Sequence, residues 1–216
     1  PPPARPLPVA APAPAVAPDV AVARFREVVA RVEPVARSVC RTQAPQRNCD
    51  FQILVDTRPG QPINAFQTVD RAGRPVIIFT AAMILDARSV DELAFVMGHE
   101  AGHHIAGHLD RQRDTALATA IIAGVLAQAG GGGAATVQVA QELGAAVGSR
   151  VFSQEFELEA DAIGTVIALR AGYDAERGVG LFGRLPDPGN RFLGSHPPNA
   201  ARVEVVRATA ARLRRS

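Results

Sequence analysis

The pattern of apolar and polar positions divides the chain into a helical beginning, a short stretch of strands and a long helical remainder. Residues 19–39 carry apolar side chains at helical spacing, and Pro34 predicts a break near the end of that helix. Three strand-like runs separated by turn residues follow, at Phe51–Asp56, Ile63–Val69 and Pro75–Thr80. These runs predict a small antiparallel sheet.

The remainder of the chain has mainly helical patterning. Ser89 and Glu92 have the spacing of a capping box, so we expect a helix from Ser89 to at least Leu109. Two further helices are predicted at residues 154–171 and 200–215. The predicted elements are therefore a small sheet followed by several helices.

An uncharged segment, residues 115–141, separates the helix beginning at Ser89 from the next one. It is rich in Ala, Gly and Ile, and Gly130–Gly133 predict a hinge between two short apolar helices. Each helix is too short to span a bilayer. A mobile lid, a hairpin on a membrane surface and a buried hairpin that closes the core all fit this pattern.

Composition indicates an ordinary globular protein, with 47% hydrophobic and 20% charged residues among 216. All 23 basic residues are arginines, but acidic residues are interspersed with them, so we expect no nucleic-acid partner. Residues 1–18 hold eight of the 17 prolines and predict an extended tail, which leaves residues 19–216 as one domain. The tail fits either a linker to a removed signal peptide or lipid anchor, or an ordinary disordered terminus.

Two cysteines, Cys40 and Cys49, flank a short polar stretch and are the only two in the sequence. A short-loop disulfide is the simplest interpretation, and it implies an oxidising compartment. Two free thiols in a cytosolic protein remain an alternative. A zinc site built on this pair is not expected, because a third and a fourth sulfur ligand are missing.

Histidines provide the clearest chemical signal, since four of the five lie within ten residues. His99, Glu100 and His103 form an H-E-x-x-H motif on the predicted helix. Its two imidazoles share one helix face and can bind one Zn²⁺, while Glu100 is placed to take a proton from the attacking water. His104 and His108 match neither role and are interpreted as structural.

The third metal ligand decides the class of zinc peptidase. A metzincin would place a histidine where Leu109 stands, so that class is excluded. Glu157 and Asp161 share one helix face, so Glu157 is expected to complete a His₂Glu site with an open fourth position. Asp161 is then expected to accept the free ring N–H of His99, while Glu159 points to solvent or lies behind the ligands.

Three separated blocks, in the same order, resemble metallopeptidase family 48, the gluzincin family that contains the HtpX-type and BepA-type proteases and the CAAX prenyl protease. The blocks are His99–His103, Ser149-Arg150 with Glu157-x-x-Ala160-Asp161, and Ser195-His196-Pro197-Pro198 with Arg202. The resemblance implies a zincin-like α+β domain, in which a small sheet packs with the H-E-x-x-H helix and the helix of the glutamate ligand. It also implies zinc-dependent endopeptidase activity.

The resemblance assigns roles to further residues. Asn64, Ala65 and Phe66 are similar to the edge strand on which gluzincins bind substrate, and the backbone of Asn64 and Ala65 would pair with an extended peptide. Plain core alternation is the alternative explanation for Ala65 and Phe66, and for Phe66 it is sufficient. His196 would approach the zinc, either to stabilise the oxyanion or to occupy the open position in a latent state, and Arg202 would assist electrostatically.

These expectations combine into one functional hypothesis and its alternatives. We expect a zinc endopeptidase that binds polypeptides, acts on unfolded or misfolded envelope proteins and resides in the bacterial periplasm, tethered through its N-terminus. Peripheral membrane contact would come from residues 115–141 or from an N-terminal anchor. The alternatives are a latent or non-proteolytic zinc-binding chaperone or adaptor plugged by His196, and a cytosolic enzyme with free thiols.

Overall fold

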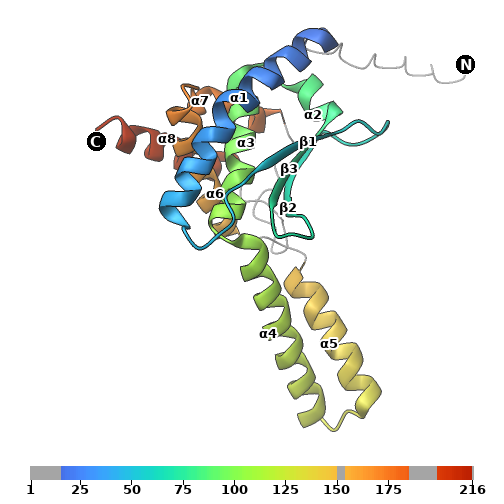
Figure 1. The fold of residues 1–216 in the computed structure, drawn as a ribbon. Helices are drawn as coiled ribbons and strands as arrows, with labels where there is room; N and C mark the ends of the chain where they lie inside the picture. The colour runs from blue at the N-terminus through green and yellow to red at the C-terminus, as the bar shows by residue number, and fades with distance from the viewer. Residues whose placement is uncertain (1–15, 150–153, 185–198, 216) are drawn as a thin grey trace, which may run out of the picture.

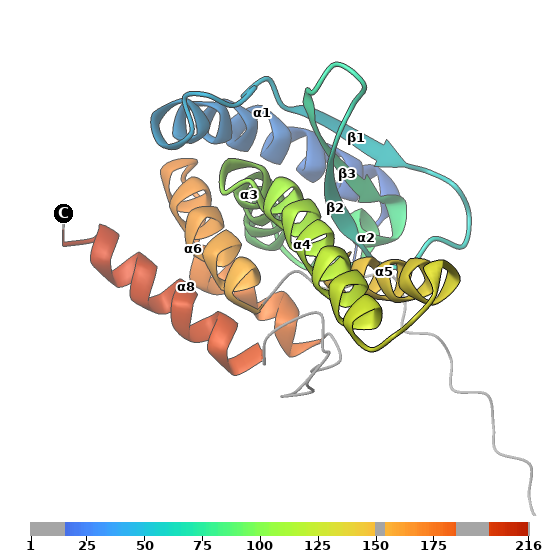
Figure 2. The same ribbon diagram turned by 90° about the horizontal axis from the view of Figure 1, so that it is seen from below.

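The computed structural model describes residues 16–149, 154–184 and 199–215. A three-stranded sheet and α1 lie on one side of the central helix α3, and α6 and α8 lie on the other (Figures 1 and 2). The helices of the described part are α1 Pro18–Gln43, α2 Ala81–Asp86, α3 Val90–Ile105, α4 His108–Ala129, α5 Ala134–Ser149, α6 Gln154–Arg170, α7 Ala175–Gly178 and α8 Asn199–Leu213, with a 3₁₀ helix at Val179–Gly183. The predicted α+β fold class is confirmed.

Helix α1 runs through Pro34 without ending there, so the predicted break is wrong. Proline removes one hydrogen bond from a helix interior, a local cost that packing can offset. Val28, Val32 and Val39 are at most 1% exposed, and they bury one face of α1 on both sides of the proline.

The sheet is mixed, which corrects the expectation of an antiparallel one. Its strands are β1 Gln52–Asp56, β2 Ala65–Val69 and β3 Pro75–Thr80, in the order β1-β3-β2. β2 and β3 form an antiparallel hairpin, but β1 pairs with β3 in parallel. Residues 57–64 are longer than a tight hairpin turn, so the chain passes the position of β3 and leaves β2 at one edge.

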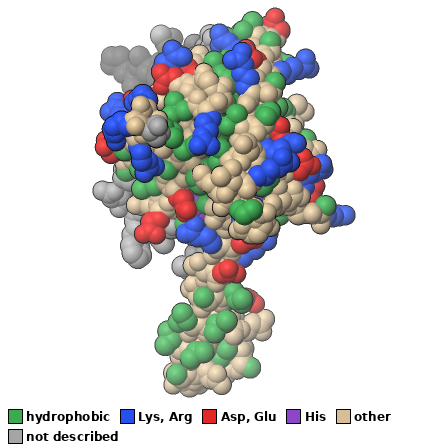
Figure 3. Space-filling model, turned by 60° about the vertical axis from the view of Figure 1, so that its left-hand side comes forward, with side chains coloured by type: hydrophobic (Ala, Val, Ile, Leu, Met, Phe, Trp, Pro, Cys, Tyr) green, Lys and Arg blue, Asp and Glu red, His purple; other side chains and the backbone are tan. Residues whose placement is uncertain are grey.

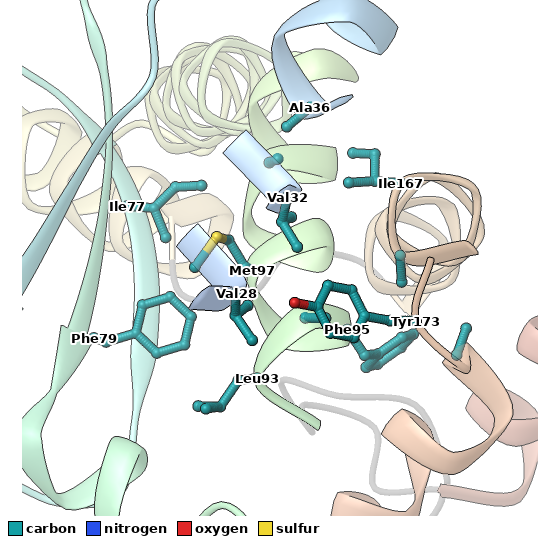
Figure 4. Close-up of a cluster of buried hydrophobic side chains, with 14 of the residues drawn as sticks. Val28, Val32, Ala36, Ile77, Phe79, Leu93, Phe95, Met97, Ile167 and Tyr173 are labelled. Atoms are coloured by element: carbon teal, nitrogen blue, oxygen red, sulfur yellow. The ribbon is translucent and has the colours of Figure 1, made fainter. Parts of the chain in front are cut away.

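Helix α3 lies at the centre of the hydrophobic core (Figure 4). Leu93, Phe95 and Met97 are at most 1% exposed, and α3 as a whole contacts α1, the strands β2 and β3, and α6. The Ser89 side chain accepts a hydrogen bond from Glu92 N–H, which confirms the predicted helix start. The structure therefore places the H-E-x-x-H motif on the most enclosed helix of the described part.

Helices α3 and α6 approach each other closely because glycines line their contact. An added Cβ on Gly98 would lie 2.7 Å from the carbonyl oxygen of Gly164, and one on Gly102 would lie 2.8 Å from that of Ala160. Both distances are shorter than a van der Waals contact. The small residues thus let the backbone of α6 pack against α3 beside the two motif histidines.

The helix predicted from Ser89 to at least Leu109 ends earlier than expected. α3 stops at Ile105, and Gly107 takes a left-handed conformation with φ of 71° before α4 begins at His108. Glycine adopts this conformation without steric cost. The chain therefore changes direction between His104 and Leu109, and His108 is carried on a new helix.

The uncharged segment lies within an antiparallel pair of longer helices, α4 and α5, that projects away from the rest of the molecule (Figure 1). Apolar side chains are exposed on its surface (Figure 3), namely Leu117, Ile121, Ile122, Val125, Leu126 and Val139. The interpretation as a buried hairpin is therefore wrong. No helix in the described part of the chain is both long and apolar enough to cross a membrane.

Candidate metal centre and active site

Three predicted ligands converge between α3 and α6. Nε2 of His99 and Nε2 of His103 lie 3.0 Å apart, and the Glu157 carboxylate oxygens lie 3.6 Å and 3.4 Å from them. All three residues are buried, and their ligand atoms lie within 4.8 Å of one another. The i, i+4 spacing on α3 and the close approach of α6 together produce this convergence.

The chemistry of these donors fits a shared cation. Asp161 Oδ1 lies 2.8 Å from His99 Nδ1, so the ring proton of neutral His99 belongs on Nδ1. Nε2 of His99 then carries a lone pair that faces Nε2 of His103 and a carboxylate. Two imidazole nitrogens and one carboxylate oxygen are a common ligand set for zinc with one position open.

Asp161 and Arg202 form a buried ion pair behind the ligands. Arg202 donates from Nε to Oδ2 and from Nη2 to Oδ1 of Asp161, each at 2.7 Å. Burial alone would raise the pKa of Asp161, but the hydrogen bonds from Arg202 and His99 outweigh burial and lower it. Asp161 therefore remains an anion that can orient the ring of His99.

Arg202, which is expected to assist electrostatically, lies beside the ligand cluster and lines the adjoining pocket. Its guanidinium group binds Asp161 in a bidentate manner and stacks 3.7 Å from the centre of the Phe182 ring. One Nη2 atom also lies 3.7 Å from Glu157 Oε2. The geometry places Arg202 beside the ligands, where it stabilises their buried carboxylates, and commits two of its donors to Asp161.

Glu100 lies beside the ligand cluster and is 8% exposed. Burial raises the pKa of Glu100 to about 7, while the neighbouring His99 and Arg202 and the backbone of Gln67 act in the opposite direction. Gln67 belongs to β2, so this strand lies beside the candidate base. Gln67 cannot be identified from the sequence, because a backbone group leaves no side-chain signal.

A pocket of about 170 Å³ opens next to the ligands. His99, Glu100 and Glu157 contribute to one part of it. The remaining wall is largely apolar and includes Ile63, Ala65, Met83, Phe95, Val96, Leu181 and Phe182. The pocket thus places polar reacting groups beside a surface suited to an apolar side chain.

The edge strand β2 borders this pocket, with one change from the expected pairing. Asn64 N–H donates to Thr80 Oγ1, and the Asn64 carbonyl accepts from Thr80 N–H at 3.0 Å, so the Asn64 backbone is already paired. Alternation in an antiparallel pair directs the backbone groups of Ala65 away from β3, toward the open edge. Asn64 and Ala65 line the pocket, whereas Phe66 does not and is 39% exposed.

His104 and His108 are both buried, but they differ in their relation to the ligands. His104 Nε2 bonds to the Asn48 carbonyl at 2.7 Å, away from the metal cluster. His108 Nδ1 lies 2.9 Å from Nδ1 of the predicted ligand His103. His108 therefore contacts the site as well as packing in the core, because the turn at Gly107 brings it back toward His103.

Two further predictions concern residues outside the metal cluster. Cys40 and Cys49 form a disulfide, which confirms the pairing. It closes the loop whose Asn48 carbonyl bonds to His104 on α3. His196 lies outside the described residues.

Comparisons with known proteins agree with this geometry. A model of peptidase family M48 matches residues 22–210. The chain is 29% identical over 160 residues to the mitochondrial metalloendopeptidase OMA1 of Arabidopsis thaliana, covering 72% of this chain and 31% of that protein. It is 30% identical over 128 residues to a putative beta-barrel assembly-enhancing protease of Vibrio cholerae, covering 55% of this chain and 26% of that protein. The chain thus spans about a third or less of these relatives.

Proposed function

The chain belongs to peptidase family M48, a family of metalloendopeptidases, and from this premise we propose that it is a zinc-dependent endopeptidase. The observation that carries the proposal is the convergence of His99, His103 and Glu157 beside Glu100 in one pocket. These residues provide three ligands, an open side and a neighbouring base, which hydrolysis of a peptide bond requires.

We assign His99, His103 and Glu157 as the ligands of one Zn²⁺. When bound, zinc supplies a Lewis acid that polarises the scissile carbonyl and makes water a stronger acid. Glu100 accepts the proton from the attacking water and passes it to the leaving amine, as general base and then general acid. A buried carboxyl group with a raised pKa suits both steps.

The residues around the ligands keep them in place during these steps. Asp161 accepts a hydrogen bond from Nδ1–H of His99, and Arg202 donates hydrogen bonds to Asp161. Both contacts are buried, so water does not compete with them. The resulting rigidity lets His99 present the same nitrogen to the pocket in every turnover.

Substrates are proposed to be polypeptides that bind as an added strand at the open edge of β2. Ala65 offers backbone groups at this edge, and Asn64 and Ala65 both line the pocket. Such pairing requires an extended chain, which favours unfolded or locally unfolded proteins. The apolar wall of the pocket would accept a hydrophobic side chain next to the scissile bond.

The disulfide supports a location outside the cytosol, because such bonds form and persist in oxidising compartments. We propose the bacterial periplasm, where misfolded envelope proteins would be the substrates. A relative named as a beta-barrel assembly-enhancing protease is consistent with this assignment. The exposed apolar side chains of α4 and α5 support peripheral membrane contact, which is part of the proposal.

Cleavage of casein by the zinc-loaded protein tests the proposed activity. Glu100→Gln is the matched variant, because it removes the base and leaves all three ligands in place. Cleavage by the wild type but not by Glu100→Gln is expected. Equal cleavage by both would contradict the role of Glu100, and no cleavage by a zinc-bound wild type would instead favour a latent or non-proteolytic protein.

A further inference from the structure

We propose that His108, Glu159 and Arg111 form a positioning relay that holds the metal ligand His103. The relay fixes which nitrogen of His103 carries the proton and thereby increases the affinity of the site for zinc. The proposal rests on the metal site proposed above, but not on peptidase activity.

The first step of the relay is the contact between two imidazoles. Nε2 of His103 faces His99 and Glu157, so this nitrogen is the metal-binding one. Its proton must then be on Nδ1, which lies 2.9 Å from Nδ1 of His108. His103 therefore donates and His108 accepts, which leaves the proton of neutral His108 on Nε2.

The second step of the relay is the contact between His108 and the carboxylate of Glu159. His108 Nε2 lies 3.0 Å from Glu159 Oε2, so the remaining proton has an anionic acceptor. Arg111 Nη1 donates to the same oxygen at 2.7 Å. Each group in the series thus has a single direction of donation, from His103 through His108 to Glu159.

Ring packing fixes the orientation of the His108 imidazole. The His108 ring stacks on Phe156 with centroids 4.5 Å apart and planes 3° from parallel. Arg111 lies over the same Phe156 ring, 4.0 Å from its centre. Phe156 and Glu159 come from α6, while His108 and Arg111 come from the first turn of α4. Two helices therefore clamp the ring that contacts His103.

A carboxylate supports each of the two motif histidines, directly for His99 and through a second imidazole for His103. His99 donates directly to Asp161, which Arg202 holds inside the protein. His103 reaches its carboxylate through one additional imidazole, and Glu159 and Arg111 are 45% and 46% exposed. A carboxylate behind a ligating histidine fixes the tautomer and raises the basicity of the ligand nitrogen.

The matched experiment uses two substitutions of His108 and measures zinc affinity by competition with a chelator. His108→Phe keeps an aromatic ring for stacking on Phe156 but removes the acceptor. His108→Gln offers an oxygen acceptor toward His103 and an N–H donor toward Glu159. We expect about 10–100-fold weaker zinc binding for His108→Phe and recovery of most of this loss for His108→Gln.

His104→Phe is the control for a purely structural effect. His104 is also a buried histidine next to His103, but it bonds to the Asn48 carbonyl. This variant is expected to lower the thermal midpoint without changing zinc affinity. A Co²⁺-loaded sample provides a second readout, because a changed ligand orientation alters the absorption bands of the metal.

Glu159→Ala keeps the proposal testable if His108→Phe does not fold, since Glu159 is half-exposed. We expect its zinc affinity to fall as well, by less than in His108→Phe. Wild-type affinity in His108→Phe, or an equal loss in His104→Phe, would overturn the relay, as would a wild type that binds no zinc. If zinc affinity responds as expected while casein is not cleaved, the relay stands and the peptidase proposal fails.

Discussion

Gly164 of α6 packs directly against the backbone of His99 on α3. An added Cβ on Gly164 would lie 2.6 Å from His99 N, well inside a van der Waals contact. The contact occurs at the level of the metal ligands, where α6 also carries Glu157 and Asp161. The absence of a side chain at Gly164 therefore sets the separation between His99 and the two carboxylates.

Replacing Gly164 with alanine should push α6 away from α3. Overpacking of a well-packed core typically costs about 1–3 kcal/mol, and we expect a loss of stability in this range. The larger ligand separation should also weaken zinc binding. Denaturant unfolding measures the first effect, and chelator competition measures the second.

Gly180→Ala is the matched control for this substitution. A Cβ added there would have no neighbour within 4 Å. We expect wild-type stability within about 0.5 kcal/mol and unchanged zinc affinity. If both alanine variants behaved alike, close packing of α3 and α6 would not be what limits the site.

Arg202→Met should be strongly destabilising, because it leaves Asp161 buried without its cation. Breaking one side of a buried ion pair typically costs about 3–5 kcal/mol. The side chain of Asp161 is fully buried and that of Arg202 is 7% exposed, so solvent cannot replace the lost partner. The free energy of unfolding in denaturant tests this prediction.

Arg214→Met, immediately after the end of α8, provides the comparison. Arg214 pairs with Glu176 at the same 2.7 Å distance, but its side chain is 61% exposed. Exposed pairs contribute about 0–1 kcal/mol, so this variant should be close to the wild type. A loss for Arg202→Met no greater than for Arg214→Met would contradict the buried-pair argument.

Ala65→Pro tests the proposed substrate strand. Proline removes the backbone N–H at the open edge of β2, where no hydrogen bond to β3 is lost. We expect KM for an extended peptide to rise several-fold while zinc binding is retained. Ala65→Val, which keeps the N–H, is the control for added bulk, and an equal effect of both would argue against strand pairing.

The disulfide is expected to contribute about 2.5–3 kcal/mol to stability, since it closes a loop over a sequence separation of nine residues. A double variant, Cys40→Ala with Cys49→Ala, should lose this amount in denaturant unfolding. A thiol count on unreduced protein should find none free. Two titratable thiols would instead support the alternative of a cytosolic enzyme.

Local spacing in the sequence predicts the three residues that the structure brings together. The i, i+4 pairs on two helices identify His99, His103 and Glu157, because periodicity alone places such residues on one face. The capping box likewise located the start of α3. Each of these inferences depends on residues within one turn or two of each other.

Features that depend on distant packing could not be predicted in the same way. Helix α1 passes Pro34 because burial on both sides outweighs one lost hydrogen bond. Arg202 reaches Asp161 from another helix, 41 residues away in sequence. His108 joins the site only because Gly107 ends α3, and glycine inside a helical pattern gives an uncertain stop signal.

Metal removal should lower stability, because zinc bound to the folded site favours the folded state. A ligand at 100 times its Kd adds about 2.7 kcal/mol, so the thermal midpoint should fall after chelation and recover with added Zn²⁺. Glu157→Gln should abolish most of this response, since it removes one ligand. Glu204→Gln, on the exposed face of α8, should respond as the wild type does. A zinc response that survives in Glu157→Gln would place the metal elsewhere and contradict the assigned ligand set.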